Sequence, residues 1–427
     1  MGYCKTDFMD YMKKTVSPYH AVAAGAKILE AAGFQKLSIK NPFVLEPGGK
    51  YYVVPYNSQL FAFTVGEKDL EKQAFHIAAA HTDYPCLHLK PTAELAGKGY
   101  LRLNTEVYGG PILNTWLDRP LSIAGRVVLR GTDAYEPETV LYCAERPVVT
   151  IPNLAVHMNR KVNEGVELKK QSDMLPLFGL ASQEEDSEYF LNFLAGELGR
   201  EKTDILDFDL YVYNTEEGAL VGIREEFFSC PRLDNHTSCY ALLTAIASGT
   251  RTDGINVIAL YDNEEIGSMT KQGADSALLV MLLEKIYAAL GMDKAAFNEA
   301  VMRSFLFSVD VAHAIHPAHP EKYDPVNYSL MNDGIVFKIN INQRYTYDAE
   351  AVATAQILCE RAGAKFKKFV NNADVAGGGT LGPIISSWLP MKTVDIGIPL
   401  LAMHSSRELM GMEDEEHLVR LMTEFFS

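Results

Sequence analysis

"INVIALYDNEEIGS", residues Ile255 to Ser268, joins an apolar run to two adjacent glutamates, Glu264 and Glu265. The apolar run has no alternating polar positions, which is typical of a strand buried on both faces of a parallel sheet. Open α/β sheets bind their ligands at the carboxyl ends of such strands. Because like charges a few ångströms apart repel, the pair predicts a positive partner nearby, either a metal ion or a basic side chain.

Composition and charge narrow the class of protein. With 427 residues, 48% hydrophobic and 22% charged, the chain is long enough for two or more domains of an ordinary globular protein. The formal net charge of −16 argues against nucleic acid and against an anionic membrane surface, because both partners require basic patches. Six cysteines without a CxxC pattern fit a reducing compartment. No apolar run is long enough to span a bilayer, so we expect a cytoplasmic protein.

Local signals define several elements near the amino end. Ser17 followed by Pro18 predicts a capped helix that ends at Gly33. A hairpin is predicted to turn near Asn57–Ser58, and residues 74–80 are predicted to form a short buried strand that runs directly into "HTDYP". These elements indicate an α/β arrangement.

The pattern along the chain predicts an interrupted domain. Strands alternate with helices in residues 1–92 and again in residues 230–427, whereas residues 93–229 consist mainly of β-type segments. We therefore predict an α/β fold with a mostly parallel sheet and helices on both faces, interrupted by an inserted β-rich domain.

Side chains that can bind metal follow the predicted buried strands. Each has an ordinary explanation by itself; an aspartate before a helix, for example, is most often a cap. Together, histidines and carboxylates at one edge of a sheet fit a metal site with nitrogen and oxygen ligands. The residues are His81 and Asp83 after the strand at 74–80, Glu264 and Glu265 after 255–261, Asp310 after "SFLFSV", His404 after "TVDIGIPLLAM", and Asp234 in "CPRLDN" at the head of a helix.

The number of candidate ligands predicts two metal ions. Even five of these seven side chains as ligands would exceed the three that one catalytic zinc ion takes while it keeps an open position. A bridging carboxylate would then hold two ions ~3.5–4 Å apart with a shared water or hydroxide between them. Imidazole and carboxylate suit zinc, cobalt and manganese, and we expect zinc. One of the paired glutamates would bind metal, and the other would accept and donate protons.

Two further motifs match known functional patterns, but their sequence context does not support those functions. "GGGTLG", residues 377–382, matches GxGxxG, but the polar stretch before it is not a strand, which disfavours dinucleotide binding. His313, His316 and His319 are spaced three apart, yet the intervening prolines would break the helix needed to align them. We predict that these histidines shape a loop beside the site.

The motifs "AHTDYPCL", "CPRLDNHTSC", "LYDNEEIGS", "SVDVAHAIHP", "NQRY" and "LLAMHSSRE" occur in this order. The sequence thereby resembles the aspartyl aminopeptidase family of dinuclear metallopeptidases across most of its length. The resemblance implies an α/β peptidase domain interrupted by a β-rich domain used in assembly. It also implies a large closed homo-oligomer, commonly a tetrahedral dodecamer, with active sites facing an interior chamber.

The resemblance also implies roles for the candidate residues. His81, Asp234 and Asp310 would hold one metal ion, and Asp234, Glu265 and His404 would hold the other, with Asp234 as the bridge. Glu264 would be the general base, and Asp83 would hydrogen-bond the far nitrogen of the His81 imidazole. His157, in "IPNLAVHMNRKVN", matches a stretch that reaches a neighbouring subunit's active site; from the residues alone it is a solvated loop histidine.

The sequence departs from the acid-preferring members of that family. Asn332 and Asp333 stand where a lysine would align, and Asn372 stands in place of an arginine. Repulsion from Asp333 would disfavour an aspartyl substrate, so we predict a preference for neutral or basic amino-terminal residues. The alternative is that Asp333 faces solvent and Lys338 or Arg344 recognises an acidic residue. The candidate substrate-binding residues are His157, Asp333, Lys338, Arg344 and Gly379.

The predicted activity is removal of the amino-terminal residue of short peptides by a metalloaminopeptidase. The same metal-binding residues would also serve a carboxypeptidase or an N-deacylase. An acid-specific aspartyl aminopeptidase is the alternative specificity. A non-catalytic assembly or cargo protein is the alternative of another class, but such a relative is expected to lose ligands or the base, and this chain has them all.

Overall fold

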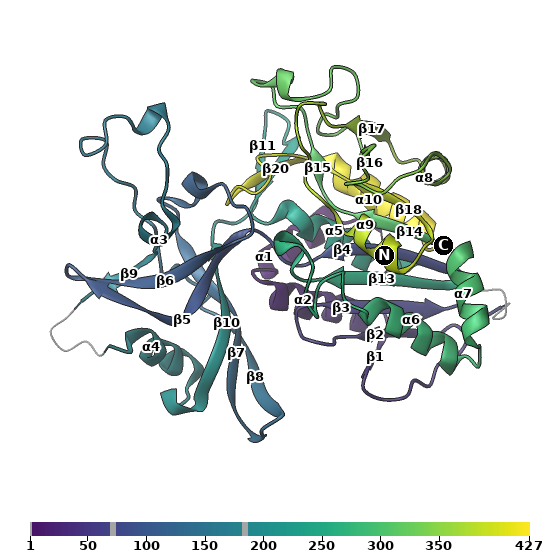
Figure 1. Cartoon of the computed structure of the whole chain (residues 1–427), viewed down its shortest axis with the longest axis horizontal. Coiled ribbons are helices and arrows are strands. Elements are labelled where there is room, and N and C mark those ends of the chain that lie inside the picture. Colours follow the sequence, from purple (N-terminus) through teal and green to yellow (C-terminus); the bar gives the residue numbers. More distant parts are fainter. Residues whose placement is uncertain (1, 69–73, 182–186) are drawn as a thin grey trace. The chain divides into compact units, whose positions relative to one another are not determined.

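The computed structural model describes residues 2–68, 74–181 and 187–427, which form two compact units (Figure 1). The first unit comprises Met1–Asp83, Gly218–Met403 and Glu408–Ser427, and the second comprises Tyr84–Glu217 and His404–Arg407. The units change at 83/84 and 217/218, and the boundaries expected from the sequence, 92/93 and 229/230, stay predictions. The assignment of these segments to a catalytic and an assembly domain stays a prediction.

The first unit is built on a nine-stranded sheet with the order β1-β2-β3-β13-β4-β14-β18-β16-β17. Pairing is parallel for β1–β2, β13–β4, β4–β14, β14–β18 and β16–β17, and antiparallel for β2–β3, β3–β13 and β18–β16. The largely parallel sheet predicted from the sequence is thus confirmed. The strands are β1 Gln35–Leu37, β2 Lys50–Val53, β3 Leu60–Val65, β4 Phe75–His81, β13 Ile255–Tyr261, β14 Phe305–Val309, β16 Ile335–Ile339, β17 Phe366–Val370 and β18 Lys392–Gly397.

Helices cover both faces of this sheet, as predicted. Alternate residues of β13 point to opposite faces, so Ile258 and Leu260 belong to one apolar core while Val257 and Ala259 belong to the other. The first core packs against α1 Lys5–Lys14, α2 Pro18–Ala31, α5 Leu233–Ser248, α8 Ala349–Ala362 and α10 Met412–Phe425. The second core packs against α6 Leu278–Ala289, α7 Lys294–Arg303 and α9 Leu381–Trp388. All seven residues of β13 are buried because both faces are covered.

The local signals near the amino end are also borne out. The Ser17 hydroxyl accepts a hydrogen bond from the His20 N–H at the start of α2, and Pro18 occupies the first turn. The β2–β3 hairpin turns through Asn57, whose φ is +67°, a left-handed conformation that asparagine tolerates.

A five-stranded sheet in the first unit was not predicted from the sequence. Its order is β11-β12-β20-β19-β15. The strands are β11 Ala219–Val221, β12 Phe227–Cys230, β15 Ala312–His313, β19 Pro399–Leu401 and β20 Glu408–Gly411. Because these strands are only two to four residues long, they carry no clear alternation of polar and apolar residues. The connection from β19 to β20 contains His404.

The second unit contains a six-stranded antiparallel sheet with the order β8-β7-β10-β5-β6-β9. Helix α4 packs on this sheet, and the Tyr189 hydroxyl both accepts from the Leu95 N–H and donates to the Arg102 carbonyl. The predicted β-rich insert is thus confirmed as an antiparallel sheet. The elements are β5 Cys86–Gly97, β6 Tyr100–Tyr108, β7 Leu121–Asp133, β8 Glu136–Cys143, α3 Lys170–Asp173, β9 Leu177–Leu180, α4 Tyr189–Leu198 and β10 Ile205–Asn214.

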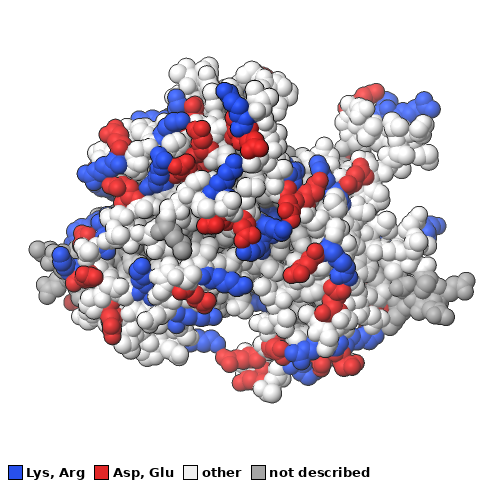
Figure 2. Space-filling model, turned by 180° about the vertical axis from the view of Figure 1, so that it is seen from behind, with Lys and Arg blue, Asp and Glu red and all other residues white. Residues whose placement is uncertain are grey.

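Figure 2 shows acidic and basic side chains interspersed over the face it presents. Among the described residues, every helix is too short or too polar to cross a bilayer.

Candidate metal centre

Three neighbouring parallel strands deliver their polar residues to the same edge of the large sheet. His81 is the last residue of β4 and lies beside Tyr261, the last residue of β13. On the other side of β4, β14 pairs in parallel and ends immediately before Asp310. Because parallel strands end at one edge, residues far apart in the sequence meet there.

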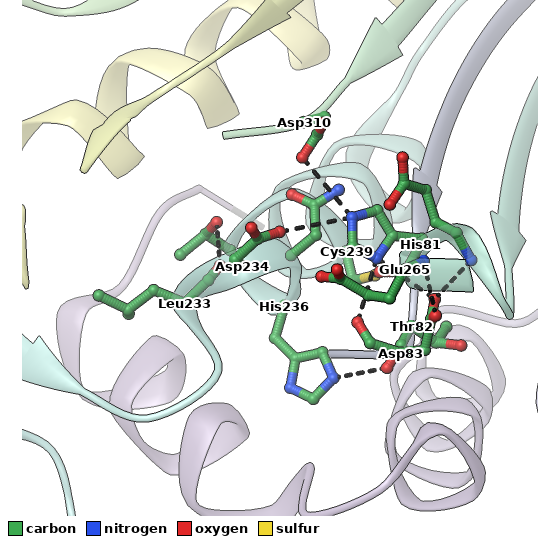
Figure 3. Close-up of polar contacts among 12 residues, drawn as sticks. His81, Thr82, Asp83, Leu233, Asp234, His236, Cys239, Glu265 and Asp310 are labelled. Atoms are coloured by element: carbon green, nitrogen blue, oxygen red, sulfur yellow. Dashed lines mark hydrogen bonds and ion pairs between the residues drawn. The ribbon is translucent and has the colours of Figure 1, made fainter. Parts of the chain in front are cut away.

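The side chains at this edge form a compact cluster. Ligand atoms of His81, Asp234 and Glu265 all lie within 4.8 Å of one another. The His81 Nε2 atom is 3.4 Å from Asp234 Oδ1 and 3.6 Å from Asp310 Oδ1. Figure 3 shows both carboxylates directed at the imidazole ring. The structure therefore brings together four of the five predicted metal ligands.

Asp83 holds the other side of the His81 ring. Its carbonyl oxygen is 3.1 Å and its Oδ1 atom 3.3 Å from His81 Nδ1. A hydrogen on Nδ1 directs the Nε2 side of the ring toward Asp234 and Asp310, the orientation that a metal-binding histidine needs. Burial lowers the pKa of His81, but hydrogen bonds to Asp234, Asp310 and Asp83 outweigh it and hold that pKa well above its usual value.

The same Asp83 carboxylate positions the adjacent glutamates, Glu264 and Glu265. Its Oδ1 accepts from the Glu264 N–H at 3.2 Å, and its Oδ2 accepts from the Glu265 N–H at 3.1 Å. The turn is reached through Asn263, whose φ is +65°. One carboxylate thus ties the end of β4 to the turn after β13, which sequence reasoning missed.

The glutamates themselves are partly exposed and lie beside several other carboxylates. Burial, followed by the nearby Asp310, Asp83 and Asp234, raises the pKa of Glu264 to about 8 even though His81 opposes the shift. Burial and Asp234 also raise the pKa of Glu265 well above its usual value. Carboxylates placed this closely stay ionised together only if a cation compensates them.

Asp234 lies where α5 begins, but it does not cap the helix. Its φ and ψ of −79° and 106° are not helical, and its N–H donates to Glu408 Oε2 at 3.0 Å. The next residue, Asn235, donates from its side chain to the Val309 carbonyl at 2.9 Å. These bonds fix the backbone from both sides and leave the Asp234 carboxylate facing His81.

Asp310 is held between the sheet and a buried lysine. Its N–H donates to the Ile396 carbonyl at 2.9 Å, and a Cβ at Gly397 would lie 1.7 Å from the Asp310 carbonyl oxygen, so a side chain at 397 would displace this backbone. Asp310 Oδ2 accepts from Lys338 Nζ at 3.2 Å. Burial opposes ionisation, but Lys338 and His81 hold the pKa of Asp310 below its usual range.

Two buried residues of α5 support the segment that carries His81. The His236 Nε2 atom is 2.8 Å from the Thr82 carbonyl, and the Cys239 thiol donates to the His81 carbonyl at 3.0 Å. Burial lowers the pKa of His236 to about 3, so its ring is neutral. Sequence reasoning missed both roles; the only signal was a polar "HTSC" inside an apolar helix.

His404 is described within the second unit. Its φ is +67°, and its Nδ1 atom lies 3.0 Å from the Gly110 carbonyl oxygen. A hydrogen on Nδ1 places the ring lone pair on Nε2, which is a tautomer suited to metal binding. Its role as the fifth ligand stays a prediction.

The predicted substrate-binding residues have different surroundings. His157 is exposed in a loop of the second unit, and Arg344 and Gly379 are exposed in the first. Asp333 Oδ2 lies 3.9 Å from Lys367 Nζ. Lys338, by contrast, is only 3% exposed and is bonded to Asp310. Their roles toward a substrate stay predictions.

The donor set fits a divalent metal. One imidazole and several carboxylates converge at a buried edge, which is the chemistry of zinc and of related ions in hydrolases. Burial, together with the neighbouring carboxylates, raises the pKa values of Glu264 and Glu265, and a bound cation would favour their ionised forms. A largely parallel α/β sheet with this cluster at its carboxyl edge defines a metal-dependent hydrolase.

Comparison with known proteins narrows this class. A family model described as "Aminopeptidase I zinc metalloprotease (M18)" matches residues 11–426. A probable M18 family aminopeptidase 2 from Clostridium novyi (strain NT) is 43% identical over 423 residues, covering 99% of this chain and 98% of its own. The chain therefore belongs to the M18 aminopeptidase family and is a metallopeptidase that removes amino-terminal residues.

Solved structures support the fold over the full length. A chain in the structure of the Ape4 and Nbr1 complex superposes with a TM-score of 0.95 at 34% identity, covering 99% of this chain and 85% of that one. A chain of the S. cerevisiae mApe1 dodecamer gives a TM-score of 0.85 at 28% identity, covering 99% and 96%. The predicted family resemblance and fold class are confirmed.

Proposed function

We propose that the chain uses two divalent metal ions, with zinc as the expected ion, to hydrolyse the first peptide bond of short peptides. His81, Asp234 and Asp310 would hold one ion, and Asp234, Glu265 and His404 the other. The observation that carries the proposal is the convergence of His81, Asp234 and Glu265 within 4.8 Å. When bound, the ions would polarise the scissile carbonyl and make water more acidic.

Glu264 is the group that moves the proton in this proposal. Its carboxylate would accept a proton from the attacking water and then donate it to the nitrogen of the leaving amine. Asp83 holds the Glu264 backbone through the N–H at 3.2 Å, so the side chain is presented from a fixed turn. A base must be well placed as well as suitably basic, and the Asp83 contact supplies the placement.

The substrate class can be tested with one pair of peptides. We expect the zinc-loaded enzyme to cleave a peptide with a free amino terminus, to leave its N-acetylated twin intact, and to lose activity in a chelator. The acidic cluster accounts for this, because it suits an α-ammonium group. Cleavage of the acetylated twin would favour an N-deacylase, and release of carboxyl-terminal residues would favour a carboxypeptidase.

The proposed specificity is for neutral or basic amino-terminal residues. Two positions where acid-preferring members are expected to carry a basic residue hold amides that bond to this chain. Asn332 donates from its side chain to the Glu226 carbonyl at 3.0 Å, and Asn372 donates to the Glu321 carbonyl at 3.1 Å. Lys338 is buried and bonded to Asp310, so its charge is already paired with a carboxylate of this chain.

We expect kcat/KM for peptides that begin with Leu, Ala or Lys to exceed that for Asp or Glu by about tenfold or more, since one lost or repulsive charge contact costs roughly 1.4 kcal/mol. The measurement is kcat/KM for the five peptides at one metal loading. A preference for Asp or Glu would instead identify an acid-specific aspartyl aminopeptidase.

The second unit is proposed to drive self-assembly, with a dodecamer as the expected form. Around His157 the apolar side chains of Leu154, Val156 and Met158 are 58%, 52% and 75% exposed, and exposed apolar side chains of this kind indicate an interface. The mApe1 relative is a dodecamer.

In light scattering we expect a mass several times that of one chain. Charged substitutions at Val156 and Met158 should lower the measured mass toward that of one chain. His157→Ala should lower activity only in the assembled protein, because the histidine is proposed to act in a neighbouring subunit. A fully active monomer would contradict the proposal.

A further inference from the structure

The two carboxylate oxygens of Asp310 have different partners. Oδ1 lies 3.6 Å from His81 Nε2, on the side of the metal cluster. Oδ2 lies 3.2 Å from Lys338 Nζ, on the opposite side. The carboxylate is therefore held at both ends.

Lys338 is itself deeply buried. It is 3% exposed on β16, an inner strand of the large sheet, where it pairs with Phe369 of β17. Its ammonium lies 5.3 Å from the centre of the Tyr345 ring, which is 4% exposed. A buried ammonium requires a charged or hydrogen-bonding partner, because leaving water is costly for a cation. Its hydrogen-bond acceptor is Asp310.

We propose that Lys338 is a positioning residue of the metal centre, whose ammonium holds Asp310 Oδ2 so that Asp310 offers the metal its Oδ1 atom alone. This inference rests on the proposed function, in which Asp310 is a ligand. Lys338 touches neither substrate nor metal in this role. It acts through Asp310, much as Asp83 acts through His81.

Lys338 also balances charge. Five of the carboxylates at this edge of the sheet belong to the proposed centre, and the Lys338 ammonium compensates part of their charge. They are Asp83, Asp234, Glu264, Glu265 and Asp310.

Charge and geometry predict opposite effects of removing Lys338. A charge effect alone would strengthen metal binding, because a cation near the metal is lost. A loss of position would weaken binding, because Asp310 Oδ2 would be a buried acceptor without its donor and the carboxylate would turn to find another. In the proposal the loss of position dominates, so removing Lys338 weakens metal binding.

The test is a zinc titration of the metal-free, full-length protein in competition with a chelating dye. We expect Lys338→Met to weaken one of the two zinc sites by about 10–100-fold, the usual effect of losing a partner that orients a ligand, and to leave the other site unchanged. Excess zinc should restore kcat. Lys338→Gln should retain more affinity, because its amide N–H can still donate to Oδ2.

A matched control and a double variant distinguish this positioning role from a non-specific loss of folding. Lys367→Met removes a lysine from the adjacent strand whose side chain is 52% exposed and lies 3.9 Å from Asp333; it should bind zinc like the wild type. Asp310→Asn should weaken the same site as Lys338→Met, and the double variant should be no weaker than Asp310→Asn alone. Because Asp310→Asn removes the carboxylate that pairs with Lys338, the double variant leaves neither member of that pair alone, and it also covers the case in which Lys338→Met unfolds.

The outcomes are distinguishable. Tighter or unchanged zinc binding by Lys338→Met, or additive losses in the double variant, would overturn the positioning role. Unchanged zinc binding with a loss confined to peptides that begin with Asp or Glu would place Lys338 on the substrate instead. Wild-type zinc binding by Asp310→Asn would contradict the ligand role in the proposed function, and this inference with it.

Discussion

Replacing Glu264 with glutamine is expected to lower kcat by about 10²–10⁴-fold, the usual contribution of a general base, while the metal content stays at the wild-type level. Glutamine has the shape of glutamate but cannot accept the proton. The turn should survive, because Asp83 binds the backbone N–H of residue 264 rather than its side chain. The measurements are kcat with a free-amine peptide and elemental analysis of the same sample.

A suitable control is Glu299→Gln, on the outer surface of α7, where the side chain is 70% exposed and lies 3.7 Å from Arg303. This variant should keep the wild-type rate. If Glu264→Gln held two metals per chain and still turned over at nearly the wild-type rate, Glu264 would not be the base. If it lost metal, Glu264 would be a ligand instead.

The second large effect is expected at Asp234. In the proposed centre Asp234 serves both metal ions, so Asp234→Asn should abolish activity and lower the content of both. Asp83→Asn should instead cost about 10–100-fold, because Asp83 touches His81 and the glutamate turn rather than a metal. The comparison requires kcat and metal content for both variants.

The structure places the Asp83 effect toward the upper end of that range. Each carboxylate oxygen of Asp83 accepts one backbone N–H, from Glu264 and from Glu265. Asparagine would present an NH₂ group to one of these donors, which loses one hydrogen bond and sets two donors against each other. Equal losses in Asp234→Asn and Asp83→Asn, at equal metal content, would argue against Asp234 as the bridge.

The large sheet was predictable because its central strands are mainly apolar and lack alternating polar positions. Residues 255–261 and 305–309 carry this signal clearly, and both are buried throughout in the structure. The five-stranded sheet was not predictable, since strands of two to four residues show no periodicity. Their position depends on pairing with segments distant in the chain.

The candidate site was predictable as a set of residues but not as a set of contacts. Placing His81, Glu264, Glu265 and Asp310 after parallel strands predicted that they meet, because strand ends share an edge. The bond from Glu264 to Asp83 joins residues 181 apart, and the bond from His236 to Thr82 joins residues 154 apart. No local pattern encodes such pairs.

The sequence by itself determined which residues end the buried strands, and therefore which side chains meet at the metal-binding edge, because hydrophobic burial fixes where a strand runs. Tertiary structure alone decided the orientation of each group. It set Lys338 against Asp310, 28 residues away in the chain, and Glu408 against Asp234, 174 residues away. Hydrogen bonds depend on ångström distances and on direction, and these arise only when the packed elements hold both partners in place.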